Sequence, residues 1–136
     1  PKVCTVVLHE NNPIRPGLEV LNRCRYTAIP VLDAEERYVG SISEGDFLQH
    51  ILKTGTTNMK EQERYRIKDI LRREFCPALP IEAEFSAVVE ASLRQNFVPV
   101  VDGRNVFCGI VTRRNLIAAI GQPVSQQESQ PVLSRA

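Results

Sequence analysis

The sequence predicts an α+β fold made of two pseudosymmetric repeats, each a small sheet flanked by two helices in the order strand, helix, strand, strand, helix. The first supporting observation is a pattern that occurs twice at a constant offset of 69 residues, without a gap. Its members are a proline, an acid, a glycine, a hydroxyl and a final Asp or Asn: Pro30, Asp33, Gly40, Ser43 and Asp46, then Pro99, Asp102, Gly109, Thr112 and Asn115. The second observation is that apolar residues also match at this offset, for example Leu48 with Ile117. Together these matches indicate an internal duplication.

The first repeat begins with residues 3–8, an apolar run rich in β-branched residues that predicts a short strand. An Asn-Asn-Pro break follows. A helix then opens at residues 16–17, with Leu18, Leu21 and Cys24 sharing one face.

The second half of this repeat is a hairpin followed by a helix. Residues 27–32 form a strand with too few polar residues to alternate, which is typical of a strand buried on both faces. A charged turn at 33–37 leads into the return strand at 38–43. Residues 44–53 form a helix with one apolar side.

The second repeat follows the same order. Its strands are expected at 78–81, 97–101 and 106–112, and its helices at 85–94 and 113–120. The turn of its hairpin falls at Asp102 and Gly103.

The remaining segments set the domain boundaries. The expected division is repeat 1 at 1–54, a linker at 55–67, repeat 2 at 68–121 and a flexible C-terminal tail at 122–136. Residues 60–74 are charge-dense and partly helical, with Ile67, Ile70 and Leu71 on one face. Because acids are mixed among the bases there, a solvated helix face explains the charges better than a nucleic-acid patch.

Composition excludes several classes of function. The net charge of +1 implies neither a nucleic-acid nor a membrane partner, and no apolar run reaches the roughly 18–20 residues of a membrane span. The four cysteines show no CxxC spacing and are expected to be reduced in a cytoplasmic protein. His9 and His50 have no ligand spacing, so no metal site is expected. No nucleophile–base pair or other catalytic residue is evident, which argues against an enzyme, and no cofactor is implied.

The hydroxyl-x-x-acid motif has two interpretations. Ser43 with Asp46, and Thr112 with Asn115, each fit an N-terminal helix capping box. Capping alone would be the simpler explanation for one copy. The duplication favours a binding role as well, since it repeats the motif at the same place in both halves. The two roles are compatible, because one hydroxyl can cap a helix and contact a ligand.

The repeat resembles the CBS domain, and the tandem resembles a CBS pair, or Bateman module. The resemblance is carried by residues 29–33 with 40–46, and by residues 98–102 with 109–115. It is strongest to the stand-alone CBS-pair proteins of bacteria, some of which bind cyclic di-AMP, through Tyr26-Thr27-Ala28-Ile29-Pro30 and Thr112-Arg113-Arg114.

This resemblance implies two clefts between the repeats that commonly hold adenine nucleotides such as AMP, ADP, ATP or cyclic di-AMP. The residues implied in the first site are Ser43, Asp46, Asn96, Phe97 and Val98. The residues implied in the second site are Tyr26, Thr27, Ala28, Thr112, Arg113, Arg114 and Asn115. The Asp or Asn would bind ribose, and the helix start and arginines would bind phosphate.

Some assignments within the two sites stay open. Tyr26 either stacks on the base or is an ordinary aromatic at a strand edge. One of Arg113 and Arg114 is expected to face the ligand, because neighbours on a helix point in different directions. Glu44 adds negative charge beside the first site, whereas Asn115 removes a charge from the second, so the second site is favoured for a phosphate-rich ligand.

The function expected from the sequence is therefore a regulatory adenine-nucleotide sensor that signals to an unknown protein effector. A ligand-free structural or dimerisation module is the alternative. The resemblance also implies a homodimer, with the apolar faces of helices 44–53 and 113–120 as candidate contacts.

Overall fold

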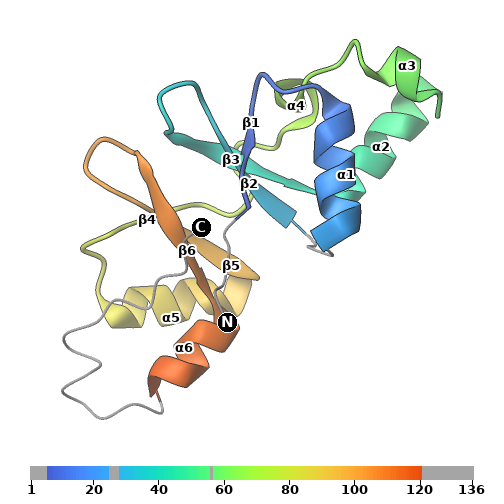
Figure 1. Ribbon diagram of the computed structural model, residues 1–136. Helices are drawn as coiled ribbons and strands as arrows, with labels where there is room; N and C mark the ends of the chain where they lie inside the picture. Colours follow the sequence, from blue (N-terminus) through green and yellow to red (C-terminus); the bar gives the residue numbers. More distant parts are fainter. Residues whose placement is uncertain (1–5, 25–27, 56, 121–136) are drawn as a thin grey trace. The chain divides into compact units, whose positions relative to one another are not determined.

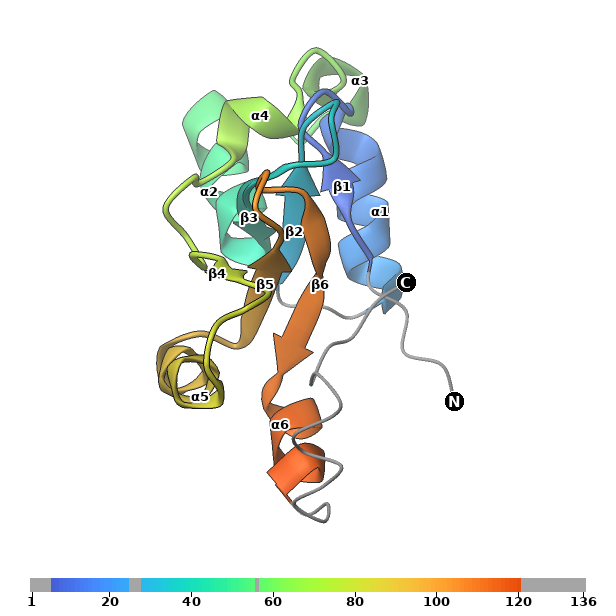
Figure 2. The same ribbon diagram turned by 90° about the vertical axis from the view of Figure 1, so that its left-hand side faces the viewer.

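The computed structural model describes residues 6–24, 28–55 and 57–120. The chain divides into two compact units, one from Val6 to Phe75 and one that includes the residues from Cys76 onward. Two views of the ribbon show one small sheet with its own helices in each unit (Figures 1 and 2).

The first unit contains a three-stranded sheet in the order β1-β2-β3. Strand β1 runs parallel to β2, and β2 forms an antiparallel hairpin with β3. The elements are β1 (Leu8–His9), α1 (Ile14–Cys24), β2 (Ala28–Leu32), β3 (Tyr38–Ser43), α2 (Glu44–Thr54), α3 (Met59–Gln62) and α4 (Ile67–Ile70).

The second unit repeats this arrangement with the sheet order β4-β5-β6, again one parallel and one antiparallel pair. Its elements are β4 (Leu79–Pro80), α5 (Phe85–Arg94), β5 (Phe97–Val101), β6 (Phe107–Thr112) and α6 (Arg113–Ile120). The α+β class and the order strand, helix, strand, strand, helix are confirmed in both repeats. The tail expected from residue 122 lies outside the described residues.

Two expected elements of the first repeat differ in extent. Within the part of 3–8 that is described, only Leu8 is in a strand, and β1 continues to His9 instead. Strand β1 pairs with β2 only at Leu8 and His9, so the described residues 6 and 7 lie before the paired stretch. The first helix begins at Ile14, before Pro16, because a proline in the first helical turn gives up no intrahelical hydrogen bond.

The charge-dense segment after α2 folds back onto the first unit. Ile67 has no exposed surface and belongs to that unit's core. Its main-chain amide donates to the carbonyl of Asn12 at 2.9 Å, and the amide of Lys68 donates to the carbonyl of Glu10 at 2.9 Å. The segment that separates the repeats in sequence is therefore an integral part of the first unit.

The two hairpins match residue by residue at the 69-residue offset. The matched residues are Asp33, Glu35, Glu36, Arg37 and Gly40, then Asp102, Arg104, Asn105, Val106 and Gly109. In each turn one carboxylate oxygen of the aspartate accepts the main-chain amides two and four residues later, at 2.8 to 3.0 Å. The residue three positions after each aspartate has a positive φ, 66° at Glu36 and 67° at Asn105. The glycine has a φ of 152° in both hairpins. The duplication is thus present in backbone conformation as well as in sequence.

The offset changes in the first half of each repeat. Leu8 in β1 lies opposite Val31, and Leu79 in β4 lies opposite Val100. The two leucines are 71 residues apart, whereas the two valines are 69 apart, so the first repeat has two extra residues between its first and second strands. One falls in the helix, since α1 has 11 residues and α5 has 10, and the other falls between the helix and the second strand.

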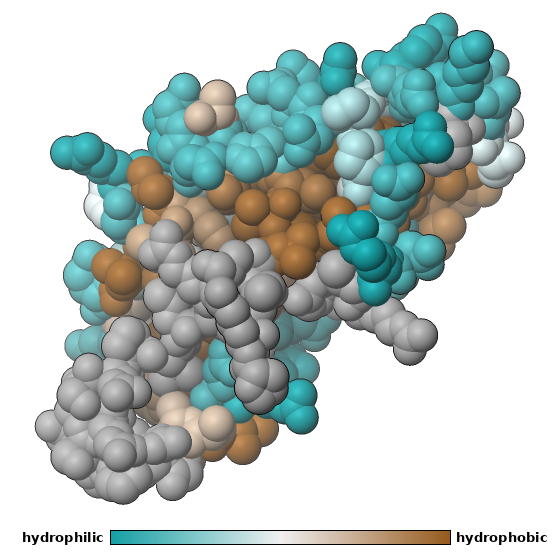
Figure 3. All heavy atoms as spheres, in the orientation of Figure 1, coloured by the Kyte–Doolittle hydropathy of each residue, from teal (hydrophilic) through white to brown (hydrophobic). Residues whose placement is uncertain are grey.

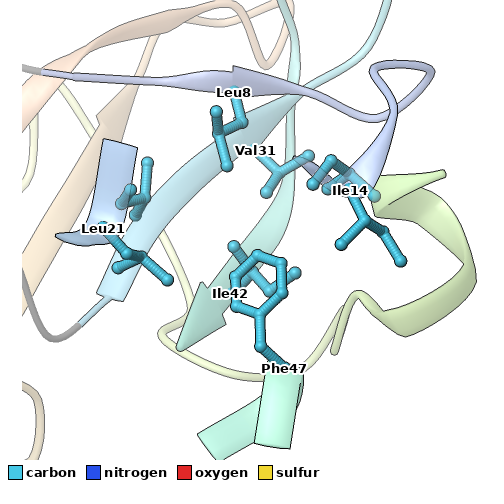
Figure 4. Packing of buried hydrophobic residues seen from close by; sticks show 8 residues of the cluster. Leu8, Ile14, Leu21, Val31, Ile42 and Phe47 are labelled. Carbon is cyan, nitrogen blue, oxygen red and sulfur yellow. The ribbon is translucent and has the colours of Figure 1, made fainter. Parts of the chain in front are cut away.

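The core of the first unit lies between its sheet and helices α1, α2 and α4. In Figure 4 the buried side chains from strands and helices point toward one another. They are Leu8, Ile14, Leu21, Ile29, Val31, Ile42, Phe47 and Ile67. The corresponding buried cluster in the second unit is Ala91, Val98, Val100, Val111 and Leu116.

Gly40 in β3 lies against the returning segment. A Cβ at Gly40 would lie 2.7 Å from the carbonyl oxygen of Arg72 and 3.0 Å from the Cα of Arg73. Its φ of 152° is also a conformation that L side chains rarely adopt. We expect Gly40→Ala to lower the free energy of unfolding by about 1–3 kcal/mol, measured by urea denaturation.

Gly103→Ala is the matched control. A Cβ at Gly103 would meet nothing within 4 Å, so this variant should stay within about 0.5 kcal/mol of the parent. Equal stability of the two variants would show that the returning segment does not press on β3.

Candidate functional site

The first half-site is formed by Ser43 and Asp46 at the start of α2. Ser43 ends β3 in an extended conformation and is the N-cap of α2. Its Oγ accepts the amide of Asp46 at 3.3 Å, while Asp46 Oδ2 accepts the amide of Ser43 at 2.8 Å and its hydroxyl at 3.0 Å. The capping box predicted from the sequence is therefore present, and it fixes both side chains at the helix start.

Arg72 completes the first half-site, and the sequence did not single it out. Its Nε lies 2.6 Å from Asp46 Oδ1, its Nη2 donates to Ser43 Oγ at 3.3 Å, and its guanidinium carbon is 3.9 Å from the ring centroid of Phe75. The signal for it was weak, because Arg72 is one of several bases in a charge-dense segment. Only the fold shows that this one reaches back to α2.

The second half-site consists of Thr112, Arg113, Arg114 and Asn115 at the start of α6. Thr112 Oγ1 accepts the amide of Asn115 at 3.1 Å, which repeats the cap of the first half-site. Among the described residues no hydrogen-bond partner is found for the Asn115 side-chain amide. Asn115, the equivalent of Asp46, therefore has a side chain that no other described residue binds.

The two arginines of the second half-site differ in their surroundings. Arg113 Nε donates to the carbonyl of Ser92 in α5 at 2.7 Å, so this guanidinium ties α6 to α5. Arg114 is exposed, and the described part of the chain offers it no hydrogen bond or ion pair. Among the described residues, Arg113 is thus bonded through its Nε, whereas Arg114 is an exposed cation without such a bond.

The other predicted site residues lie near these helix starts or outside the description. Ala28 opens β2 opposite Ser43, and Phe97 opens β5 opposite Thr112. Asn96 is exposed, whereas Phe97 is 7% and Val98 0% exposed.

Two further site residues, Tyr26 and Thr27, lie outside the described residues. The grouping of Ser43 and Asp46 with 96–98, and of Thr112 and Asn115 with 26–28, stays a prediction.

Two polar side chains away from the helix starts, His50 and Asp33, have partners within the first unit. His50 is buried, bonds through Nε2 to Gln62 Oε1 at 2.7 Å and meets the Tyr65 ring edge-on. The Asp33 carboxylate accepts the main-chain amide of Arg37, and this bond with others lowers the pKa of Asp33 below its ordinary value. The described residues include no group of three or more His, Cys, Asp or Glu placed to hold a metal ion. Their helices are also too short or too polar to cross a membrane.

Comparison with known proteins gives a consistent result. The family model for the CBS domain matches the chain twice, at residues 5–53 and 67–122. The cyclic di-AMP receptor B of Bacillus subtilis (strain 168) is 26% identical over 113 residues, which are 83% of this chain and 76% of that protein.

Two solved structures extend the comparison. The structure of Listeria monocytogenes CbpB protein in complex with c-di-AMP is 27% identical in sequence, with a TM-score of 0.73. The match covers 93% of this chain and 91% of the Listeria chain. CbpB from Streptococcus agalactiae has a TM-score of 0.78 at 21% identity, covers 97% of this chain and 82% of its own, and supports the fold.

The contact of Arg113 predicts a structural cost for its removal. We expect Arg113→Ala to lower the free energy of unfolding by about 1 kcal/mol, because the hydrogen bond to the Ser92 carbonyl is lost. Arg114→Ala should change it by less than about 0.5 kcal/mol, since that side chain makes no such bond. Urea denaturation of both variants measures the difference, and a larger loss for Arg114→Ala would reverse the two roles.

Proposed function

The chain belongs to the CBS domain family and carries two copies of the domain; from this premise we propose that it is a cytoplasmic regulatory module that binds an adenine nucleotide. Cyclic di-AMP is the first choice of ligand, ahead of AMP, ADP and ATP, and occupancy would be signalled to a partner protein. The choice rests on the relatives, since a B. subtilis relative is a cyclic di-AMP receptor and a Listeria relative was solved with c-di-AMP.

The observation that carries the proposal is the open second half-site. Within four consecutive residues lie the start of α6, the guanidinium of Arg114 and the side-chain amide of Asn115, and neither side chain is bonded to another described residue. A helix start presents unpaired amides and the positive end of the helix dipole to an anion. An arginine adds charge-assisted bonds in a geometry that suits phosphate oxygens.

The chemistry of cyclic di-AMP fits this set of groups. Each of its two phosphates carries one negative charge, which a single cation with a helix start can balance. The Asn115 amide both donates and accepts hydrogen bonds, so it can bind a ribose hydroxyl without adding negative charge beside the phosphate. We propose that Arg114 and the helix start bind phosphate, that Asn115 binds ribose, and that the adenine meets Tyr26, Thr27 and Ala28.

A ligand-free dimerisation module is the second candidate, and exposed apolar side chains favour a dimer in either case. Leu48 and Leu52 on α2 are 63% and 76% exposed, and Ile117 and Ile120 on α6 are 70% and 56% exposed. Hydrophobic residues are also visible at the surface in Figure 3. Nucleotide binding and dimerisation are compatible, and the experiments below separate them.

The ligand prediction is tested by calorimetric titration with cyclic di-AMP. Arg114→Ala should weaken binding tenfold or more, because a lost charge-assisted hydrogen bond is worth roughly 1.5–3 kcal/mol. Asn115→Ala should cost less than Arg114→Ala if phosphate contacts dominate the affinity, and more if ribose contacts dominate.

Arg104→Ala is the control for removing one positive charge, because Arg104 is an exposed residue in the β5–β6 turn. It should bind like the parent protein. A thermal-shift series with AMP, ADP, ATP and cyclic di-AMP completes the test, since a ligand at 100 times its Kd stabilises a protein by about 2.7 kcal/mol. If none of the four raises the melting temperature at millimolar concentration, the ligand-free module becomes the better proposal.

The dimer prediction is tested by sedimentation velocity at micromolar concentration, where the parent should have twice the chain mass. Leu48→Asp combined with Ile117→Asp should give a monomer, because each change places a charge in an apolar contact that would otherwise stabilise the dimer by about 1.5–3 kcal/mol per residue. Leu93→Asp is the control, since Leu93 on α5 is 76% exposed but lies on another helix. A monomeric parent at high concentration contradicts the prediction.

A further inference from the structure

The two half-sites have equivalent backbones but opposite states. Asp46 in the first is paired with Arg72, whereas the Asn115 side chain in the second has no partner within the described part of the chain. We propose that Arg72 closes the first half-site to nucleotide, so that the chain takes up one nucleotide, at the second half-site. This inference rests on the proposed function, because it treats both half-sites as members of one nucleotide-binding type.

The acceptor positions of the Asp46 carboxylate are nearly used up. A carboxylate offers about four lone-pair positions. Oδ1 accepts from Arg72 Nε at 2.6 Å, and Oδ2 accepts the amide of Ser43 at 2.8 Å and its hydroxyl at 3.0 Å. One position therefore remains, while a ribose brings two neighbouring hydroxyl donors. The side chain of Asp46 is also only 10% exposed, which leaves little room for a second approach.

Arg72 is held in this position from several directions. Its guanidinium stacks on Phe75 at 3.9 Å and donates through Nη2 to Ser43 Oγ at 3.3 Å. Its backbone forms a bridge with Ser41 in β3. Tyr38 in β3 donates its hydroxyl to the carbonyl of Phe75 at 3.3 Å. A ligand that displaced the guanidinium would have to break its ion pair with Asp46, its bond to Ser43 and its contact with the Phe75 ring, although 52% of the Arg72 side chain is exposed.

The charges around the first half-site determine which compound can detect binding there once Arg72 is removed. Without Arg72, the start of α2 retains the carboxylates of Glu44 and Asp46 and loses its paired cation. Two carboxylates repel a phosphate but still accept hydroxyl donors. Adenosine, which is neutral and carries a ribose, is therefore the probe, and cyclic di-AMP reports on the second half-site.

The experiment is calorimetric titration of the full chain with each compound. The parent protein should bind one cyclic di-AMP per chain, and its weak affinity for adenosine should not change with Asp46→Ala. Arg72→Ala should bind adenosine at least tenfold more tightly than the parent does. This gain should disappear in the Arg72→Ala/Asp46→Ala double variant, while the affinity of Arg72→Ala for cyclic di-AMP stays within twofold of the parent.

Arg72→Met guards against a folding defect, because its side chain can still cover Phe75 without carrying charge. Two folded Arg72 variants without any gain in adenosine affinity would overturn the inference. Two cyclic di-AMP per parent chain, or an Asp46-dependent adenosine site in the parent, would overturn it as well. Failure of the proposed function shows separately as absence of cyclic di-AMP binding to the parent, since the adenosine comparison does not depend on the second half-site.

Discussion

One hydrogen bond positions the other groups at both helix starts. It joins the hydroxyl at the end of each return strand to the amide of the third helical residue. Ser43 Oγ accepts from Asp46 and Thr112 Oγ1 from Asn115, so the same bond joins strand to helix in each unit. The cap uses a single amide of the first helical turn. The remaining unpaired amides and the side chain at the third position are what a ligand or an arginine can then use.

On this shared frame the two units have diverged in charge. The first has Glu44, Asp46 and an ion pair to Arg72, and the second has Arg114 and an uncharged Asn115. Because the backbone is held by the same turns and the same cap, these few side chains determine the electrostatic difference between the half-sites. A duplicated module can in this way assign different tasks to its two halves without changing its fold.

The hairpin of each repeat was the most predictable part of the chain. Proline, aspartate and glycine at fixed spacing determine the strand ends and the turn through local bonds, so β2, β3, β5 and β6 were expected within one residue of their bounds. Strand β1 was less predictable, because the apolar residues 6 and 7 have the composition of a strand but do not pair with β2. At the site, the capping residues followed from their spacing. The sequence also predicted that Arg113 and Arg114 differ, but not that Arg113 is the one bonded to the Ser92 carbonyl. Arg72 could not be predicted, since its partner Asp46 lies 26 residues earlier and only the return of the segment across Gly40 brings them together.

That return has a consequence for how the protein is made. The core around Ile14 lacks Ile67 until the segment after α3 has folded back, and the bonds to Asn12 and Glu10 close the loop only then. On the ribosome, the first unit cannot finish folding when its sequence repeat ends near Thr54. It must wait until about Phe75 has left the exit tunnel, when synthesis of the second unit has already begun. The repeat visible in the sequence and the unit that folds during translation are therefore different stretches of chain.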